Sequence, residues 1–357
     1  MKKKTVIGIV LAAVLLLIVV AAVFAVPKIK AYLPYYYDKT GKHQEDKPYT
    51  LTIEKEDFEN EVAIRLVENG VICSTARFLS YLKQNYPDFI WYNGIYNLNA
   101  NMSYKELCEA LMKPDITLNY IKFVVPEGKS VRAIATIVEE SGLCSAEAFL
   151  EAADSYDYNY PFLEELKSRD QNLIGYKLEG FLFPATYEFR EDTTSPRDIV
   201  DKMLKTFTEY ITQDMIQKAQ DMGLSLNQFI SFGSVVQAEA FSKDSMANVS
   251  SVFWNRLNSD DLKRLQSDPT KTYGNSLQNL PGYTQQMKDA YDTYSCQGLP
   301  VGPTNCPGVD VLKAVLEPAQ TDYYYFVTDK NGKFYFNRTL AEHNQTIRSL
   351  RESGLWA

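Results

Sequence analysis

The sequence has little excess positive charge and few side chains of the kinds that bind metals. Its 357 residues include 37 lysines and arginines against 45 aspartates and glutamates, which gives a net charge of −8. This balance argues against a nucleic-acid-binding protein, because neutralising phosphates requires a basic face. Two histidines and five cysteines, with no Cys-x-x-Cys pair, leave little material for a zinc site or a Ser-His-Asp triad. We expect neither a metal nor a cofactor.

Aromatic residues, in contrast, are plentiful. The chain holds 25 tyrosines and three tryptophans, which suit a groove that stacks on sugars and equally suit an ordinary hydrophobic core. The length is too great for one ordinary core and predicts two domains. A mean hydropathy of −0.27 excludes a polytopic membrane protein but allows a single span.

An uncharged run near the N-terminus predicts that span. It extends from Val6 to Val26, and its 21 residues, at about 1.5 Å each, match a hydrocarbon core of roughly 30 Å. We therefore expect a cytoplasmic tail at 1–5, a transmembrane helix at 6–26 and a linker at 27–48. The remaining chain is expected outside the cytoplasm, in a protein of the cell membrane.

A cleaved signal peptide is the alternative for the same run. Val23-Phe24-Ala25 offers a small-residue cleavage site. Signal peptides usually have shorter apolar regions, of about 7–15 residues. The uncleaved anchor is therefore the favoured interpretation.

Two folded regions follow, and together they predict an α+β protein. Residues 49–118 alternate strand and helix patterns, with a capping box from Ser103 to Glu106, and are typical of a small α/β module. Residues 119–357 predict a larger mixed α+β domain with a C-terminal hairpin turning at Asn331-Gly332. Its main predicted helices cover residues 145–168, 196–222, 225–241, 244–258 and 339–353.

The helix predicted at 225–241 carries the best candidate for acid catalysis. Apolar residues cover most of its circumference, so it should be largely buried. Glu239 lies three and four residues after Val236 and Val235, beside the apolar stripe. Burial raises the pKa of a carboxyl and keeps it protonated as a general acid. Alternatively, Glu239 is a terminal-turn residue that pairs with Lys243.

Several separate segments, in this order, resemble the endolytic murein transglycosylase family, the YceG-like proteins. They read LEGFLFPATYEF, VVQAEA, NVSSVFWNRL, RLQSDPTKTYG, YDTYSCQGLPVGPTNCPG and PAQTDYYYFVTDKNGKFYFNRTLAEHN. The resemblance extends from about residue 50 to the C-terminus. It implies a LysM-like module at 49–118, a transglycosylase catalytic domain at 119–357, and association with cell-wall synthesis complexes.

The resemblance also implies a reaction. It is cleavage of the β-1,4 bond between N-acetylmuramic acid and N-acetylglucosamine in peptidoglycan strands, with formation of 1,6-anhydro ends. The family's helical Glu-x-Glu pattern corresponds here to Gln237-Ala238-Glu239, so only Glu239 remains acidic. A single carboxylate suffices, because the sugar's own C6 hydroxyl is the nucleophile. Glu239 is therefore the predicted catalytic acid and base.

Further motif residues are candidates for substrate binding. In the QSDPT turn, Asp268 either contacts glycan or caps the turn by bonding to backbone. The loop after residue 290 either lines the groove or is simply a long ordered loop. The substrate-binding candidates are Gln266, Asp268, Thr270, Tyr273, Tyr294 and Asn305.

Alternatives to this assignment stay open at the level of sequence. Glu179 and Glu188 are other possible acids, and His343 is expected on the surface. A non-catalytic glycan-binding scaffold is favoured by Gln237, and an ordinary hydrolase would need a second carboxylate about 5–10 Å from the first. Three cysteines (Cys73, Cys108 and Cys144) are expected to be buried thiols, whereas Cys296 and Cys306 share one loop and could pair.

Overall fold

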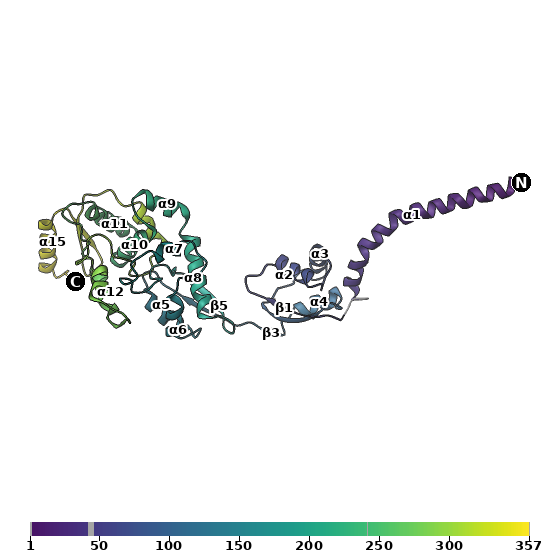
Figure 1. Ribbon diagram of the computed structural model, residues 1–357, viewed down its shortest axis with the longest axis horizontal. Helices are drawn as coiled ribbons and strands as arrows, with labels where there is room; N and C mark the ends of the chain where they lie inside the picture. The colour runs from purple at the N-terminus through teal and green to yellow at the C-terminus, as the bar shows by residue number, and fades with distance from the viewer. Residues whose placement is uncertain (1, 42–45, 241, 357) are drawn as a thin grey trace. The chain divides into compact units, whose positions relative to one another are not determined.

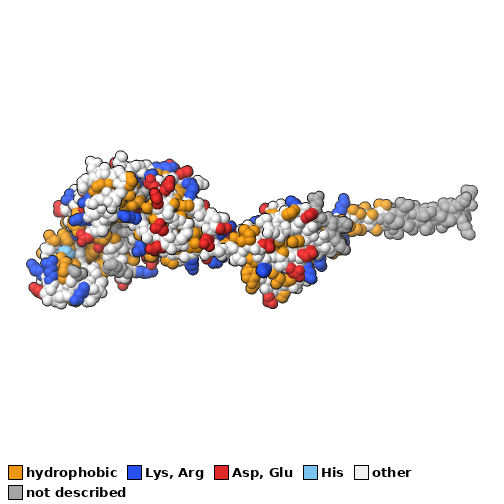
Figure 2. Space-filling view, turned by 90° about the horizontal axis from the view of Figure 1, so that it is seen from below, with side chains coloured by type: hydrophobic (Ala, Val, Ile, Leu, Met, Phe, Trp, Pro, Cys, Tyr) orange, Lys and Arg blue, Asp and Glu red, His pale blue; other side chains and the backbone are white. Residues whose placement is uncertain are grey.

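The computed structural model describes the backbone of residues 2–41, 46–240 and 242–356, and their side chains from residue 19 onward. The chain forms two compact units, Met1–Asn119 and Tyr120–Ala357. Figure 1 shows helices and short strands in both units, and the predicted α+β class is confirmed. Acidic and basic side chains are interspersed on the face drawn in Figure 2.

The first unit begins with a long helix, α1 (Lys2–Thr40), which contains Pro27 and Pro34. The helix extends to Thr40, inside the segment 27–48, where the apolar residues follow neither a helical nor a strand period. The side chains of residues 6–18, most of the predicted membrane span, lie outside the described part of the structure. Among the residues that are described, no helix combines the length and the apolar character needed to cross a membrane.

The rest of the first unit is a small sheet covered by helices. Its strands pair in the order β1-β2-β3, with both pairs antiparallel. The core gathers Leu51, Phe78, Tyr96 and Tyr104, all at most 1 % exposed. The elements are β1 (Pro48–Ile53), α2 (Glu59–Glu68), α3 (Thr75–Asn85), β2 (Gly94–Asn99), α4 (Tyr104–Leu111) and β3 (Ile116–Thr117).

The end of α1 is tied to this core by one carboxylate. Asp38 is buried, and its Oδ2 accepts hydrogen bonds from the Cys73 backbone N–H at 2.6 Å and the Tyr104 hydroxyl at 3.3 Å. Cys73 itself is exposed, so the expectation that its thiol is buried is wrong. Its sequence neighbours form the irregular turn between α2 and α3 and leave the side chain at the surface. The capping box of Ser103 and Glu106 is confirmed.

The second unit opens with a two-stranded antiparallel sheet and three helices. Strand β4 (Tyr120–Val124) pairs with β5 (Thr186–Arg190). Between them come α5 (Val131–Ser141), α6 (Ala146–Ala153) and α7 (Leu163–Lys167). The single helix predicted at 145–168 is therefore wrong, because residues 154–162 form turns rich in aromatic side chains that pack on the core.

The remaining helices surround α10 (Leu226–Glu239), whose sides are buried almost all round. The prediction of one helix at 196–222 is wrong, since Thr212 caps a new helix after Ile211. The other elements are α8 (Pro196–Tyr210), α9 (Gln213–Asp221), α11 (Lys243–Leu257), α12 (Asp268–Ser276), η1 (Leu277–Asn279), α13 (Gln285–Tyr291), α14 (Val309–Leu316), β6 (Tyr325–Thr328), β7 (Phe334–Asn337) and α15 (Leu340–Glu352).

Helix α12 lies where the sequence predicts a turn. Asp268 and Pro269 occupy its first positions. Proline is tolerated in the first turn of a helix, because the N–H that it lacks would have no intrahelical acceptor there. The QSDPT motif is therefore a helix start.

Candidate active site

Helix α10 is fixed at its N-terminus by charged side chains from α7 and the loop after it. The Glu165 carboxylate accepts hydrogen bonds from the backbone N–H groups of Leu226 (3.3 Å) and Asn227 (2.8 Å). The Arg169 guanidinium donates to Asn227 Oδ1 at 3.0 Å. A carboxylate at this position satisfies N–H groups that have no partner inside the helix and complements the helix dipole.

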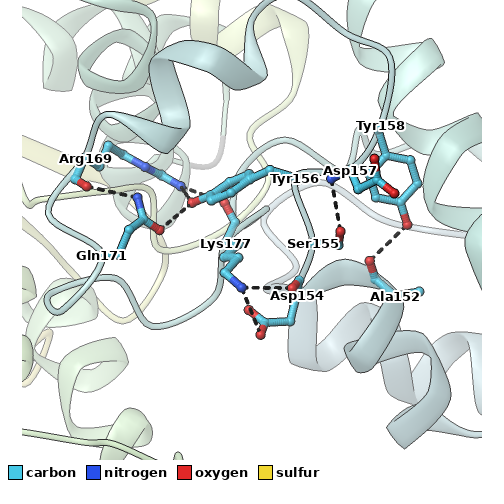
Figure 3. Close-up of polar contacts among 9 residues, drawn as sticks. All are labelled: Ala152, Asp154, Ser155, Tyr156, Asp157, Tyr158, Arg169, Gln171 and Lys177. Atoms are coloured by element: carbon cyan, nitrogen blue, oxygen red, sulfur yellow. Dashed lines mark hydrogen bonds and ion pairs between the residues drawn. The ribbon is translucent and has the colours of Figure 1, made fainter.

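Arg169 is in turn held by a polar network (Figure 3). Its Nη2 donates to the Tyr156 hydroxyl at 2.9 Å and to the Lys177 carbonyl at 2.7 Å. The Tyr156 hydroxyl donates to Gln171 Oε1, and Lys177 pairs with Asp154 at 3.2 Å. This network holds the N-terminal end of α10, and Glu239 lies at the other end of the same helix.

That last residue is Glu239. Its side chain is half-buried, and its Oε1 accepts a 2.7 Å hydrogen bond from the Ser267 hydroxyl. Burial raises the pKa of the Glu239 carboxyl above its ordinary value, the Ser267 hydrogen bond lowers it, and the charge of Asp268 raises it. Lys243 pairs instead with Asp310 at 2.9 Å, so the alternative ion pair with Glu239 is wrong.

Glu239 faces a cavity of about 420 Å³, which we call the Glu239 cavity. Three of the predicted binding residues line it, namely Gln266, Asp268 and Tyr294. The Tyr294 hydroxyl donates to Asp268 Oδ1 at 2.9 Å. Glu239 and Asp268 are the two acidic residues among the described residues that form its lining.

Gln266 has a strained backbone at this site. Its φ of 53° is the one positive value among the non-glycine residues that the structure describes. Such a conformation costs of order 1–3 kcal/mol and persists only where the surroundings impose it. Arg256 holds this segment by donating to the carbonyl of Leu265 at 2.9 Å and to Gln266 Oε1 at 3.2 Å, and the Gln266 backbone N–H donates to the Thr293 carbonyl at 3.2 Å.

The other three predicted binding residues are buried and hold the frame of the site. The Thr270 hydroxyl bonds to the Ser267 carbonyl at 2.7 Å and to the Thr293 hydroxyl at 2.8 Å. Asn305 Nδ2 donates to the Ser234 carbonyl at 2.8 Å. The Tyr273 hydroxyl donates to Glu179 Oε2 at 3.0 Å.

The two alternative acids have other surroundings. Glu179 is 1 % exposed and accepts from the Val131 backbone N–H and the Tyr273 hydroxyl, both at 3.0 Å. Burial raises its pKa to about 8, so it is protonated at neutral pH deep beside the start of α5. Glu188 is half-buried on β5, in register with Lys122 on β4. Neither lines the Glu239 cavity.

Gln237 also has a defined partner. Its Oε1 accepts a 2.9 Å hydrogen bond from the backbone N–H of Gly308, the residue that caps α14. An amide oxygen can take the place of a carboxylate oxygen as this acceptor, with a weaker hydrogen bond. The side chain therefore helps to join α10 to α14.

Sequence reasoning missed several residues of the Glu239 cavity. The expectation that His343 lies at the surface is wrong: it is half-buried on α15, lines the cavity, and stacks on Tyr325 with ring centroids 5.5 Å apart. Burial and the charge of Arg256 lower its pKa. A histidine that follows an acidic residue in a polar helix gives no sequence signal of this contact. Ser267, which donates to Glu239, was also missed. Its place inside the QSDPT motif was the clearest signal that it belongs to the site.

The described cysteines are all free thiols. Cys306 is fully buried, and its backbone bridges to Lys129, whereas Cys296 is half-buried in another part of the loop. The pairing of Cys296 with Cys306 that the sequence left open is therefore not formed. Cys108 is buried as expected, and Cys144 is half-buried.

Comparison with known proteins identifies the family. A sequence model of the YceG-like family matches residues 51–349. The chain belongs to the YceG-like family. The match covers most of both units, including the helix that carries Glu239 and the QSDPT motif.

Named relatives of this YceG-like protein share one description. An endolytic murein transglycosylase of Bacillus subtilis (strain 168) is 29 % identical over 291 residues, which cover 80 % of this chain and 79 % of that protein. One of Streptococcus pneumoniae serotype 2 (strain D39) is 28 % identical, over 80 % of this chain and 55 % of that protein. A crystal structure of a yceG-like protein from Listeria monocytogenes is 27 % identical, with a TM-score of 0.52, and covers 85 % of this chain and all of that one.

The Ser267 hydrogen bond generates a first prediction. A hydroxyl that donates to a carboxylate stabilises the ionised form, so replacing Ser267 with Ala should raise the pKa of Glu239 further. The measurement is an NMR titration of the Glu239 side-chain carboxyl. Ser267→Thr keeps the hydroxyl and serves as the control. An equal Glu239 pKa in the Ala and Thr variants would contradict the role given to this bond.

Proposed function

We propose that this YceG-like protein is a membrane-anchored endolytic lytic transglycosylase. It cleaves the β-1,4 bond between N-acetylmuramic acid and N-acetylglucosamine in peptidoglycan strands and leaves 1,6-anhydro ends. The observation that carries this proposal is one half-buried carboxyl, Glu239, with a raised pKa, facing a cavity at the end of a buried helix. The named relatives support the substrate class.

The reaction needs one group that first gives and then takes a proton. Glu239 in its protonated form donates to the glycosidic oxygen as the bond breaks, and the substrate's acetamido group supports the positive charge at C1. The resulting carboxylate then removes the proton from the C6 hydroxyl, which attacks C1 and closes the anhydro ring. Ser267 suits both steps of the reaction, because its hydroxyl orients the Glu239 carboxyl and stabilises the negative charge that is left after the proton is donated.

A hydrolase is the second candidate, because the structure brings Asp268 into the same cavity. Hydrolysis requires a second carboxylate to activate water or to attack the sugar. Asp268 accepts from the Tyr294 hydroxyl and lies at the first position of α12. In our proposal its negative charge keeps the pKa of Glu239 high and favours the cationic transition state, without any bond to the sugar.

Gln237 favours the scaffold alternative, because it stands where the family pattern has a glutamate. Its side chain accepts a hydrogen bond from the Gly308 N–H, which gives it a structural role. In our proposal Glu239 alone supplies the acid that the reaction needs, and its raised pKa and its position at the cavity support this role.

A second prediction concerns Glu239 directly. Glu239→Gln keeps the size of the side chain and removes the proton that must be donated. Proton transfer by a positioned side chain is commonly worth 10²–10⁴-fold, and we expect a loss near the upper end. The measurement is the rate at which 1,6-anhydro ends form from isolated glycan strands, with the melting temperature recorded in parallel.

Two matched variants control this experiment. Glu188→Gln should keep the wild-type rate, because this residue does not line the cavity. Glu179→Gln replaces a buried carboxyl that is already neutral, and should also keep most of the activity. A wild-type rate for Glu239→Gln would refute the assignment and move the search to the other two carboxylates.

We further propose that Val6–Val26 anchors the protein in the cell membrane, with residues 1–5 in the cytoplasm and the catalytic unit outside. The length of this uncharged run supports the proposal. The third prediction is that the run stays in the mature protein. N-terminal sequencing of the protein from membrane fractions tests it, and a chain that begins at Val26 would contradict it.

Residues 49–118 are proposed to be a LysM-like module that binds glycan without cleaving it. Their independent core supports a separate role, as does the exposed Tyr92. The fourth prediction is that deleting the module weakens binding of polymeric peptidoglycan while some cleavage remains. If the truncated protein bound polymeric peptidoglycan as tightly as the full-length protein, the module would be only a spacer. Cell-wall synthesis proteins are the proposed protein partners, on the family resemblance alone.

A further inference from the structure

The segment that follows α15 bends sharply and brings Trp356 to the Glu239 cavity. Gly354 adopts a left-handed φ of 67°, and its N–H donates to the Arg351 carbonyl at 3.1 Å. The N–H of Leu355 donates to the Leu350 carbonyl at 2.8 Å. These two bonds form the Schellman motif that commonly ends a helix, in which glycine takes the left-handed position without steric cost. The direction of the chain before Trp356 is therefore set by a defined helix end.

The same segment is also held by the hairpin of β6 and β7. Lys330, in the turn of that hairpin, donates its backbone N–H to the Leu355 carbonyl at 3.0 Å and its Nζ to the Gly354 carbonyl at 2.6 Å. The Trp356 N–H donates to the Leu350 carbonyl at 3.0 Å. The backbone that carries Trp356 is therefore fixed both to α15 and to the hairpin.

Trp356 presents part of its indole to the Glu239 cavity. The side chain lines this cavity and is 38 % exposed. The Arg351 guanidinium lies over the ring, with its Cζ 4.9 Å from the ring centroid, in the arrangement of a cation–π contact. Arg351 thus covers one face of the indole, and the exposed remainder of the ring is available to a ligand.

The surroundings of this indole suit a sugar. Arg256, Gln266 and Asp268 line the same cavity with polar groups that can form hydrogen bonds with hydroxyls. Ligand sites typically combine an aromatic surface with a few polar groups that orient the ligand. A pyranose ring has an apolar face of C–H bonds, and this face packs on the electron-rich face of an aromatic ring.

We propose that Trp356 is a substrate-binding residue of the active site, whose uncovered indole face stacks on a sugar ring of the glycan strand in the Glu239 cavity. The inference rests on the proposed function. Trp356 lies beyond residues 51–349, which match the YceG-like family, so the family match does not assign this contact. The contact belongs to the segment after α15 of this chain.

The test compares substitutions that keep or remove the aromatic face. Trp356→Tyr keeps an aromatic ring, and Trp356→Leu keeps an apolar side chain without one. Tyr210→Leu is the matched control, because Tyr210 is an exposed aromatic residue of the same unit that does not line the cavity. Each variant is made in the Glu239→Gln protein, so that the ligand is bound and not cleaved. The probe is peptide-free glycan strands, with affinity measured by calorimetry and the melting temperature recorded in parallel.

Loss of an aromatic stacking contact should make Trp356→Leu bind the strands about tenfold more weakly than the Glu239→Gln parent. Trp356→Tyr and Tyr210→Leu should bind like the parent. Strands should also shift the tryptophan fluorescence of the parent to shorter wavelength, because the sugar shields the indole from water. The other two tryptophans, Trp91 and Trp254, do not line the cavity, so this shift should shrink in Trp356→Tyr, which still binds.

Equal affinities of Trp356→Leu and the parent would overturn the stacking role. A fluorescence shift that persists undiminished in Trp356→Tyr would overturn it as well, since the indole would then not contact the ligand. A parent that binds strands through Trp356, together with a wild type that does not cleave them, would instead overturn the proposed function alone.

Discussion

The burial of helix α10 is the constraint on which the rest of the second unit depends. Helices α11, α12 and α14 pack against it, and Gly233 lets α14 approach so closely that a Cβ there would lie 2.4 Å from a Leu312 methyl. A helix buried on all sides can expose a polar side chain to a cavity most readily at its ends. Glu239 occupies the last position, where the carbonyl end of the helix dipole disfavours a negative charge. Burial and position thus act together to raise the pKa of this carboxyl.

The surrounding polar groups allow Glu239 to give up its proton. A fully buried carboxyl such as Glu179 is held neutral and cannot exchange its proton with substrate. Glu239 is open to a cavity, and the Ser267 hydroxyl stabilises its ionised form. The left-handed backbone of Gln266, held by Arg256, lies just before Ser267 and directs the start of α12. The strained residue therefore lies directly before Ser267, the residue whose hydroxyl bonds to the acid.

Periodicity and capping residues are local signals, so they were enough to predict the α+β class and the helix at 225–241. Glu239 and the motif beside it were selected by the family resemblance. Helix α12 was missed because Asp-Pro is equally typical of a turn. Thr270 and Asn305 were recognised as important, yet sequence could not distinguish a side chain facing the groove from one facing the frame. Arg256 and His343 join the cavity through contacts between α11, β6 and α15, and no local pattern reports such long-range packing.

The central claim is that one carboxyl, Glu239, serves as both acid and base, with the sugar's own hydroxyl as nucleophile. A mass spectrum of glycan strands digested by the full-length protein tests it most directly. The account predicts products that end in 1,6-anhydro-N-acetylmuramic acid, which are lighter by one water than hydrolysis products. Reducing ends would show that water is the nucleophile, make Asp268 a second catalytic carboxylate, and contradict the account.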